Sequence, residues 1–159
     1  MRWAFRIATG VKSGAGHVAR CASIAQVMDA TITVFTDPDA TNFQSTSRIY
    51  DGIETEARPD SADELLSACR AERYDAVLID NYAISDSIVA HLTQGTFTAV
   101  FRDSAVGGAE SISVSIRPAA VDGSNLIGGL RYAPLAGCYA ELGTRAAVGH
   151  PKPVSPVRI

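Results

Sequence analysis

His17 is the residue of this chain whose type and position best suit chemistry. It follows Gly14 and Gly16 at the point where a loop becomes the first turn of a helix. Glycine lets the backbone turn tightly and approach a bound molecule closely, because it carries no side chain. The unpaired N–H groups and partial positive charge of a helix start favour an anion and disfavour protonation of a nearby imidazole. We therefore interpret His17 as a general base, with helix capping as its alternative role.

A strand and a helix must flank this loop. Residues 3–9 read as a strand, and apolar residues then recur at helical spacing. That apolar helix face consists of Val18, Cys21, Ala22, Ala25 and Met28. The histidine is thus expected at the junction of a strand with a helix.

Strands and helices continue to alternate downstream. Ser61 and Glu64 form a capping-box pattern that predicts a helix over residues 61–73, and Ser85 predicts the start of another helix. Further strands are predicted at residues 31–35, 52–56, 75–80, 96–101 and 112–116. This alternation predicts an α/β fold in which a parallel sheet is flanked by helices on both faces.

Polar residues follow several of these strands. The carboxyl ends of parallel strands share one edge of the sheet, and ligands bind beyond that edge. Besides the glycine loop, this edge receives Asp37, Asp80, Tyr82, and the pair Arg102-Asp103. Helix capping and turn formation are the alternative roles for the aspartates.

Composition narrows the class of protein. The chain has 159 residues, enough for one domain, with 47% hydrophobic residues and a net charge of −3. These values argue against disorder and against a nucleic acid held by a basic surface. Apolar runs fall far short of the roughly 20 residues of a membrane span, and no signal peptide is evident, so we expect a cytoplasmic protein. The three cysteines read as buried free thiols, and we predict neither a metal nor a cofactor.

A dinucleotide-binding domain is a competing interpretation. Residues 14–19 match the G-x-G-x-x-A form of the fingerprint, and Asp37 lies about where a ribose-binding acid is needed. However, four residues, 10–13, separate the first predicted strand from Gly14, whereas the turn of the fingerprint follows its strand directly. A P-loop is excluded because no Gly-Lys-Ser/Thr follows the glycines.

Three segments resemble a known family. The pattern Gly14-x-Gly16-His17-x-x-Arg20-Cys21 resembles the N-terminal signature of the UDP-sugar hydrolases of the pseudaminic acid pathway and their relatives among spore-coat polysaccharide proteins. Residues 77–82 are similar to that family's strand ending in Asp-Ser-Tyr, and residues 129–135 to its Gly-x-x-Tyr-x-x-Leu segment. The matches occur in the family's order and span most of the chain.

This resemblance implies a two-domain GT-B fold with the active site between the domains. Residues 1–148 would form the Rossmann-like N-terminal domain, and residues 149–159 the linker and the start of a C-terminal domain that is absent from this sequence. The implied substrate is a UDP-linked acetamido sugar, bound mainly through the nucleotide by that second domain or by a partner polypeptide. The isolated chain would then be inactive.

The resemblance also implies residue roles. His17 would activate a water that attacks the anomeric carbon and releases UDP, while Asp80, Tyr82 and Asp103 would position the sugar and Arg20 would brace the loop. Gly14 and Gly16 would lie against the substrate. Two alternatives remain open: a glycosyltransferase in which His17 activates an acceptor hydroxyl, and a non-catalytic sugar-binding or partner domain.

The chain departs from the family pattern at three places. Arg102-Asp103 stands where the family usually carries two acids, and a later family asparagine has no clear counterpart around Arg117-Pro118. These two departures leave the identity of the sugar open. The third is the aspartate often present in the family's first loop, which is not evident between Thr9 and Ser13.

Overall fold

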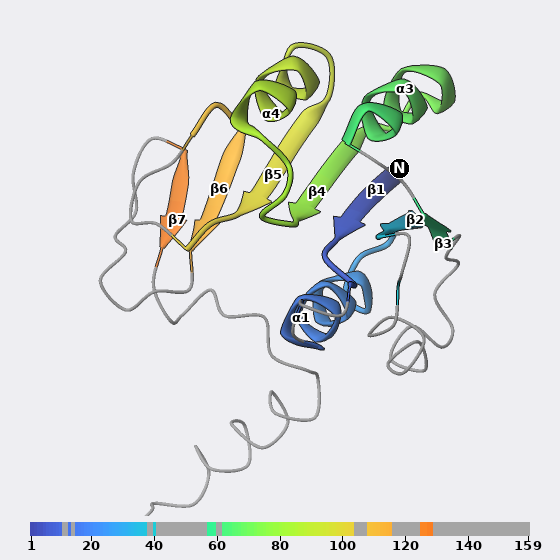
Figure 1. Cartoon of the computed structure of the whole chain (residues 1–159), viewed down its shortest axis with the longest axis vertical. Helices are drawn as coiled ribbons and strands as arrows, with labels where there is room; N and C mark the ends of the chain where they lie inside the picture. Colours follow the sequence, from blue (N-terminus) through green and yellow to red (C-terminus); the bar gives the residue numbers. More distant parts are fainter. Residues whose placement is uncertain are drawn as a thin grey trace, which may run out of the picture.

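The computed structural model describes residues 1–10, 13, 15–37, 40, 57–59, 62–103, 108–115 and 125–128. Within these residues a seven-stranded parallel sheet has the order β3-β2-β1-β4-β5-β6-β7 (Figure 1). The strands are β1 (Arg2–Ile7), β2 (Thr31–Thr36), β3 (Ala57–Pro59), β4 (Ala76–Asp80), β5 (Phe97–Phe101), β6 (Ile112–Ser115) and β7 (Leu126–Gly128). The helices are α1 (Ala15–Ala25), α3 (Ala62–Glu72) and α4 (Asp86–Thr93). The α/β class predicted from the sequence is confirmed.

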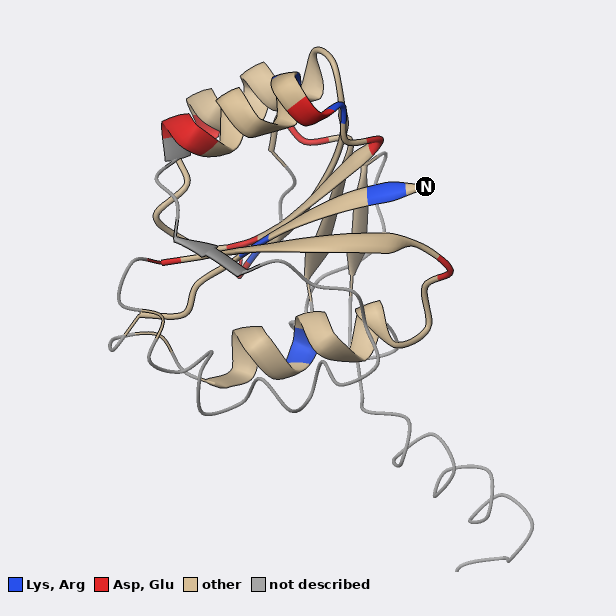
Figure 2. Ribbon diagram, turned by 90° about the vertical axis from the view of Figure 1, so that its right-hand side faces the viewer, with Lys and Arg blue, Asp and Glu red and all other residues tan. Residues whose placement is uncertain are grey.

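Helices cover both faces of the sheet. Figure 2 shows α1 below the sheet and the α3 layer above it, and α4 lies beside α3 in Figure 1. Each face has its own apolar core, because successive strand residues point to opposite faces. Phe5 and Ile7 pack with α1, whereas Val77 and Ile79 pack with α3 and α4. This is the doubly wound arrangement that a parallel sheet requires.

The same alternation determines where polar side chains at the strand ends point. Arg6 lies between Phe5 and Ile7, so it faces the α3 and α4 side. Asp80 follows Ile79 and therefore faces α1. The sheet thus carries one charged side chain toward each helical layer near its carboxyl edge.

The chain changes direction between β1 and β4. From β1 it crosses to β2 and β3 on one side, and it returns through α3 to β4 on the other side of β1. The segments that follow two such neighbouring strands run to opposite faces and leave a crevice, where ligands bind in open α/β sheets. The residues after β1 and at the end of β4 are therefore the first place to look for a site.

Several details differ from the sequence predictions. The third strand is found at residues 57–59, whereas the predicted segment 52–56 lies outside the described residues, and β7 was not predicted. Ser85 is the N-cap of α4, but its side chain makes no capping bond and lies 2.8 Å from the hydroxyl of Ser87 instead. The capping residue Ser61, Gly14 and the segments 129–135 and 149–159 also lie outside the described residues.

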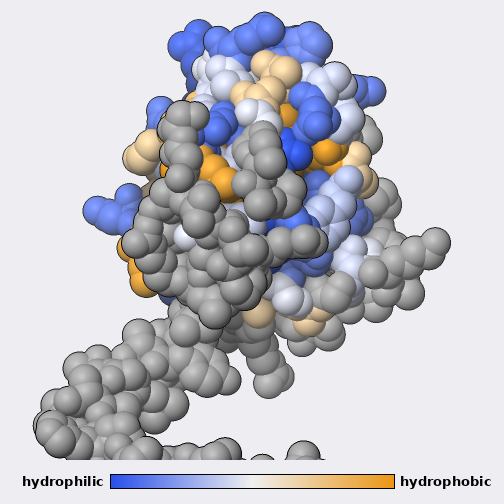
Figure 3. All heavy atoms as spheres, turned by 90° about the vertical axis from the view of Figure 1, so that its left-hand side faces the viewer, coloured by the Kyte–Doolittle hydropathy of each residue, from blue (hydrophilic) through white to orange (hydrophobic). Residues whose placement is uncertain are grey.

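The face of the molecule seen in Figure 3 is mostly hydrophilic at its top. There, on the side of α4, hydrophilic residues predominate, and hydrophobic ones form small patches below them. The large hydrophobic residues exposed in the described part of the chain are Met1, Val27, Tyr82 and Phe97. Of these, Tyr82 lies beyond the carboxyl end of β4.

A buried carboxylate joins β5 to β6. Glu110, 3% exposed, accepts hydrogen bonds from Arg102 at 2.7 and 2.6 Å, from the amide of Gly108 at 2.9 Å, and from the Ser113 hydroxyl. Burial alone would raise the pKa of Glu110, but the bonds from Arg102 and Ser113 outweigh it and lower the pKa to about 2. Arg102 also pairs with Asp86 of α4 at 2.7 Å, so this cluster joins the residue after β5 to α4 and to the segment before β6.

Glu110→Gln should lower the free energy of unfolding by about 3 kcal/mol or more, because it leaves the Arg102 guanidinium without its buried partner. Asp86→Asn removes the other carboxylate from the same guanidinium, but its side chain is 74% exposed and the loss should stay below about 1 kcal/mol. Urea unfolding of both variants near neutral pH measures this contrast.

The contribution of Glu110 to the free energy of unfolding should also depend on pH. A lowered folded-state pKa means that the stabilisation is complete above the ordinary pKa of 4.5 and is lost as the pH falls toward 2. The wild-type chain should therefore approach the stability of Glu110→Gln across this range. Equal stabilities at neutral pH would contradict the assignment.

Candidate active site

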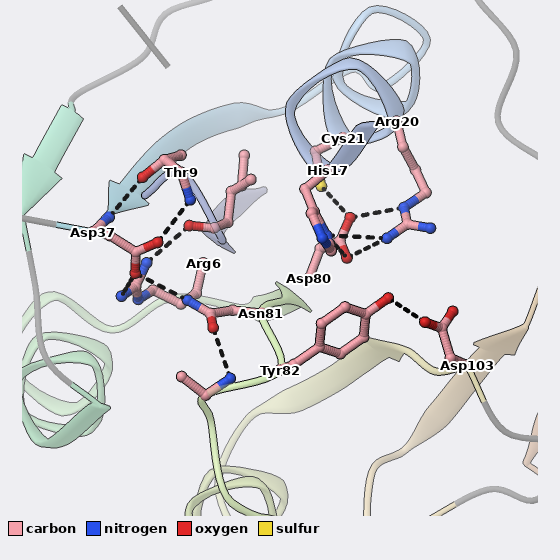
Figure 4. A network of polar contacts seen from close by, with 12 residues as sticks. Arg6, Thr9, His17, Arg20, Cys21, Asp37, Asp80, Asn81, Tyr82 and Asp103 are labelled. Atoms are coloured by element: carbon pink, nitrogen blue, oxygen red, sulfur yellow. Dashed lines mark hydrogen bonds and ion pairs between the residues drawn. The ribbon is translucent and has the colours of Figure 1, made fainter. Parts of the chain in front are cut away.

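His17 and Asp80 meet at the crevice between β1 and β4. His17 lies in the first turn of α1, Asp80 is the last residue of β4, and the imidazole Nδ1 is 2.7 Å from Asp80 Oδ1 (Figure 4). The Asp80 side chain is fully buried and that of His17 is 13% exposed. Two residues that are 63 positions apart in sequence thus form a histidine–carboxylate pair.

Asp80 is held as an anion by several donors on α1. Arg20 donates from Nε to Oδ2 at 2.7 Å and from Nη2 to Oδ1, and the Cys21 thiol lies 3.6 Å from Oδ2. Burial alone would raise the pKa of Asp80, but the bonds from His17 and Arg20 outweigh it and lower the pKa. The carboxylate therefore stays ionised at neutral pH.

An ionised Asp80 determines which imidazole nitrogen carries the proton. A carboxylate only accepts hydrogen bonds, so its 2.7 Å partner Nδ1 must donate. Arg20 Nη2 lies 3.2 Å from the same nitrogen, but it is committed to Asp80. In the neutral ring Nε2 then has a free lone pair and can accept a proton from a bound molecule.

Arg20 and Cys21 have structural roles in this pair. The Arg20 guanidinium lies 4.3 Å from the centre of the Phe101 ring, a cation–π contact that helps to hold it in place. Burial, followed by the nearby Asp80 charge, raises the pKa of Cys21 well above its ordinary value. Cys21 is thus a neutral donor and no nucleophile. Sequence reasoning assigned it no chemistry, although its position four residues after His17 on one helix face was a usable signal.

Tyr82 and Asp103 border the pair. The rings of His17 and Tyr82 meet edge to face with centroids 5.1 Å apart, and Tyr82 donates from its hydroxyl to Asp103 at 2.6 Å. Burial and then the Asp103 carboxylate raise the pKa of Tyr82. Because the tyrosine is 60% exposed, its face is open to a bound molecule. The structure therefore places His17, Arg20, Asp80, Tyr82 and Asp103 next to one another, and the roles assigned to them stay predictions.

A cavity of about 320 Å³ opens beside Tyr82. Its apolar lining comes from the last residues of β4 and β5, from α4 and from the turn before α4, and Asn81, Tyr82, Arg102 and Asp103 supply its polar groups. This size and mixed lining suit a small organic ligand. The Arg102 guanidinium is already bound by Glu110 and Asp86. Among the lining residues, Asp103 supplies the carboxylate that can accept a bond from a ligand hydroxyl.

Gly16 lies next to His17 at an exposed position. A Cβ atom at this position would meet none of the described atoms within 4 Å. The described residues therefore leave room for a side chain here. Gly14, the other glycine expected to bind substrate, lies outside the described residues.

Asp37 does not offer the free carboxylate that a dinucleotide site needs. Its Oδ1 accepts from Arg6 at 2.6 Å and from Asn81 at 3.1 Å, and its Oδ2 accepts from the amides of Thr9 at 2.7 Å and Gly10 at 3.0 Å. A carboxylate has about four acceptor positions, and all are used. The geometry therefore disfavours the dinucleotide interpretation of the glycine loop.

Three further observations concern the described residues. They contain no group of three His, Cys, Asp or Glu side chains arranged to hold a metal ion. None of their helices is both long and apolar enough to cross a membrane. Cys21 and Cys69 are buried free thiols, as predicted.

Comparison with known proteins supports the fold alone. No protein-family model matches the chain, and no curated protein matches it in sequence. Among solved structures, MurG from Acinetobacter baumannii is similar, with a TM-score of 0.56 and 11% sequence identity. The match covers 80% of this chain and 44% of MurG, so the chain spans less than half of that protein. The domain is thus Rossmann-like and resembles the GT-B fold of MurG.

The Cys21 thiol should resist alkylation in the folded chain, because it is fully buried and its pKa is raised well above the ordinary value. Iodoacetamide labelling followed by peptide mass spectrometry measures this, with labelling in denaturing urea as the control. Rapid labelling of Cys21 under native conditions would show that the thiol is exposed as a thiolate, contrary to its place beside Asp80.

Proposed function

We propose that this chain forms the N-terminal domain of a nucleotide-sugar-dependent glycosyltransferase, in which His17 is the general base. One observation carries the proposal: the imidazole is bound through Nδ1 to a buried, ionised carboxylate, and Nε2 is left as the proton acceptor at the sheet's crevice. The resemblance to the GT-B fold of MurG supports a sugar-transfer reaction.

The proposed reaction begins with a hydroxyl of an acceptor placed near Nε2. The hydroxyl oxygen attacks the anomeric carbon of the sugar as its proton passes to Nε2, and the bond from that carbon to the diphosphate oxygen breaks. The diphosphate leaves as UDP with the bonding electrons. Asp80 stabilises the imidazolium that forms, and general-base catalysis of this kind contributes about a hundred- to ten-thousandfold.

The sugar is assigned to the cavity beside Tyr82. The exposed tyrosine ring can pack against an apolar face of a sugar, and Asp103 can accept a bond from a sugar hydroxyl or an acetamido N–H. We assign the nucleotide to a second domain or partner polypeptide, as the resemblance of the sequence implies. A UDP-linked acetamido sugar is accordingly the proposed substrate, and the domain boundary at residue 148 belongs to the same proposal.

Hydrolysis is the second candidate, and the ordered sequence matches to the UDP-sugar hydrolases favour it. In that reaction the same His17 takes the proton from water, and the products are UDP and a free sugar. The two candidates differ in one measurable respect. A hydrolase releases free sugar without an acceptor, whereas a transferase depends on one.

His17→Gln in the natural full-length polypeptide should slow UDP release by about a hundred- to ten-thousandfold, because the amide cannot act as the base. His91→Gln is the matched control: His91 is exposed on α4, and its Nδ1 bonds to the Ser87 carbonyl. Chromatographic measurement of UDP, with and without candidate acceptors, gives the rates.

Near-normal release of UDP by His17→Gln would contradict the general-base role. If the wild-type polypeptide binds UDP-sugars but releases no UDP under any acceptor condition, the domain is a sugar-binding module and the catalytic proposal is wrong.

A further inference from the structure

A second charged cluster lies on the other face of the sheet from His17 and Asp80. Its cation, Arg6, is 3% exposed and faces the side of α3 and α4. Arg6 Nη1 donates to the Ile7 carbonyl at 2.9 Å, and Nη2 donates to Asp37 at 2.6 Å. A buried guanidinium requires such a carboxylate, so the position of Asp37 after β2 is constrained by Arg6 in β1.

Asp37 joins three strand ends. Besides Arg6, it binds the Thr9 and Gly10 amides just after β1 and the Asn81 side chain just after β4. The Thr9 hydroxyl in turn accepts from the Asp37 amide at 2.8 Å. Burial alone would raise the pKa of Asp37, but the bonds from Thr9 and Arg6 outweigh it and lower the pKa. The Asp37 carboxylate therefore stays charged at neutral pH.

The residues held by Asp37 are continuous with the two members of the catalytic pair. Thr9 and Gly10 begin the loop that leads to His17, and Asn81 is bonded covalently to Asp80. Asn81 also accepts from the Ala83 amide at 2.8 Å, which fixes the turn that carries Tyr82 (Figure 4). Asp37 contacts neither the His17 ring nor the Asp80 carboxylate. It binds residues that lie close to each of them in the chain.

We propose that Asp37 is the positioning residue of this site: it ties Thr9 and Gly10 after β1 to Asn81 after β4 and so fixes the distance between His17 Nδ1 and Asp80. The catalytic importance of that distance rests on the proposed function, but the geometric claim does not. Catalytic groups must be held within about 0.5 Å of their productive geometry, and one ångström of misplacement costs on the order of a hundredfold in rate.

The test compares Asp37→Ala with Asp75→Ala in the 159-residue chain labelled with ¹⁵N. Asp75 is a matched control, because its carboxylate also binds a backbone amide, that of Arg2 at 2.7 Å, but at the opposite edge of the sheet. The measured quantity is the exchange with water of the His17 Nδ1 proton, assigned by its loss in His17→Gln. Unfolding midpoints of all variants are measured in parallel.

Asp37→Ala should accelerate this exchange by roughly tenfold, as expected when loss of the Asp37 contacts weakens the pair by about the net free energy of one hydrogen bond. Asp75→Ala should leave the exchange at the wild-type rate even if its midpoint falls. Equal exchange in both variants would overturn the proposal, because it would show that Asp37 contributes only general stability.

Asn81→Ala provides a second route if Asp37→Ala does not fold. It removes the link between Asp37 and the β4 turn and leaves the bonds to Arg6, Thr9 and Gly10 in place. Faster exchange of the His17 proton supports the proposal, and unchanged exchange overturns it. Since no substrate is used, absence of sugar transfer would refute the proposed function without affecting this result.

Discussion

The burial of Asp80 is the constraint on which the candidate site depends. A carboxylate with no exposed surface loses its hydration, a loss of several kcal/mol that only close donors can offset. All of these donors come from one helix: His17, Arg20 and Cys21 follow one another at helical spacing on α1. The helix can therefore dock on the sheet in only one rotation and one position along its axis. Recognition of Asp80 by α1 thus places the imidazole at the crevice between β1 and β4.

On the opposite face of the sheet a buried charge is also offset by a close partner, but the signs of the charges are reversed. There the buried group is the Arg6 cation, and the offsetting carboxylate is that of Asp37. Both clusters lie at the carboxyl ends of the central strands, where the apolar cores of the two faces end. A polar crevice in an otherwise hydrophobic sheet is the result, and the cavity beside Tyr82, which has a mixed polar and apolar lining, adjoins it.

The sequence predicts the fold better than it predicts the connections within the site. The alternation of strands and helices gave the parallel α/β sheet, because apolar periodicity reflects burial directly. It also indicated that His17, Asp80, Tyr82 and Asp103 lie at one edge. It missed β7, a strand of only three residues whose pairing with β6 depends on distant backbone.

Other features of the site are not predicted by local sequence patterns. The sequence placed Asp37 as a possible ribose-binding acid, because its spacing from the glycines is right for that role. Only the three-dimensional structure shows that Arg6, Thr9, Gly10 and Asn81 use all of its acceptor positions. Likewise, the spacing of Cys21 from His17 indicates a shared helix face, but it does not show that a carboxylate from β4 lies beside the thiol. Contacts across the sheet depend on strand order, which local periodicity does not encode.

Determining the tautomer of the His17 ring in the wild-type chain tests the role of this histidine most directly. Nitrogen-15 NMR of the neutral imidazole distinguishes a protonated Nδ1 from a protonated Nε2. We predict that the proton lies on Nδ1, which donates it to Asp80, and that Nε2 is the atom that accepts a proton from a substrate. A proton on Nε2 of the neutral ring would contradict this prediction, because His17 would then present a donor to the crevice and could not act as the base.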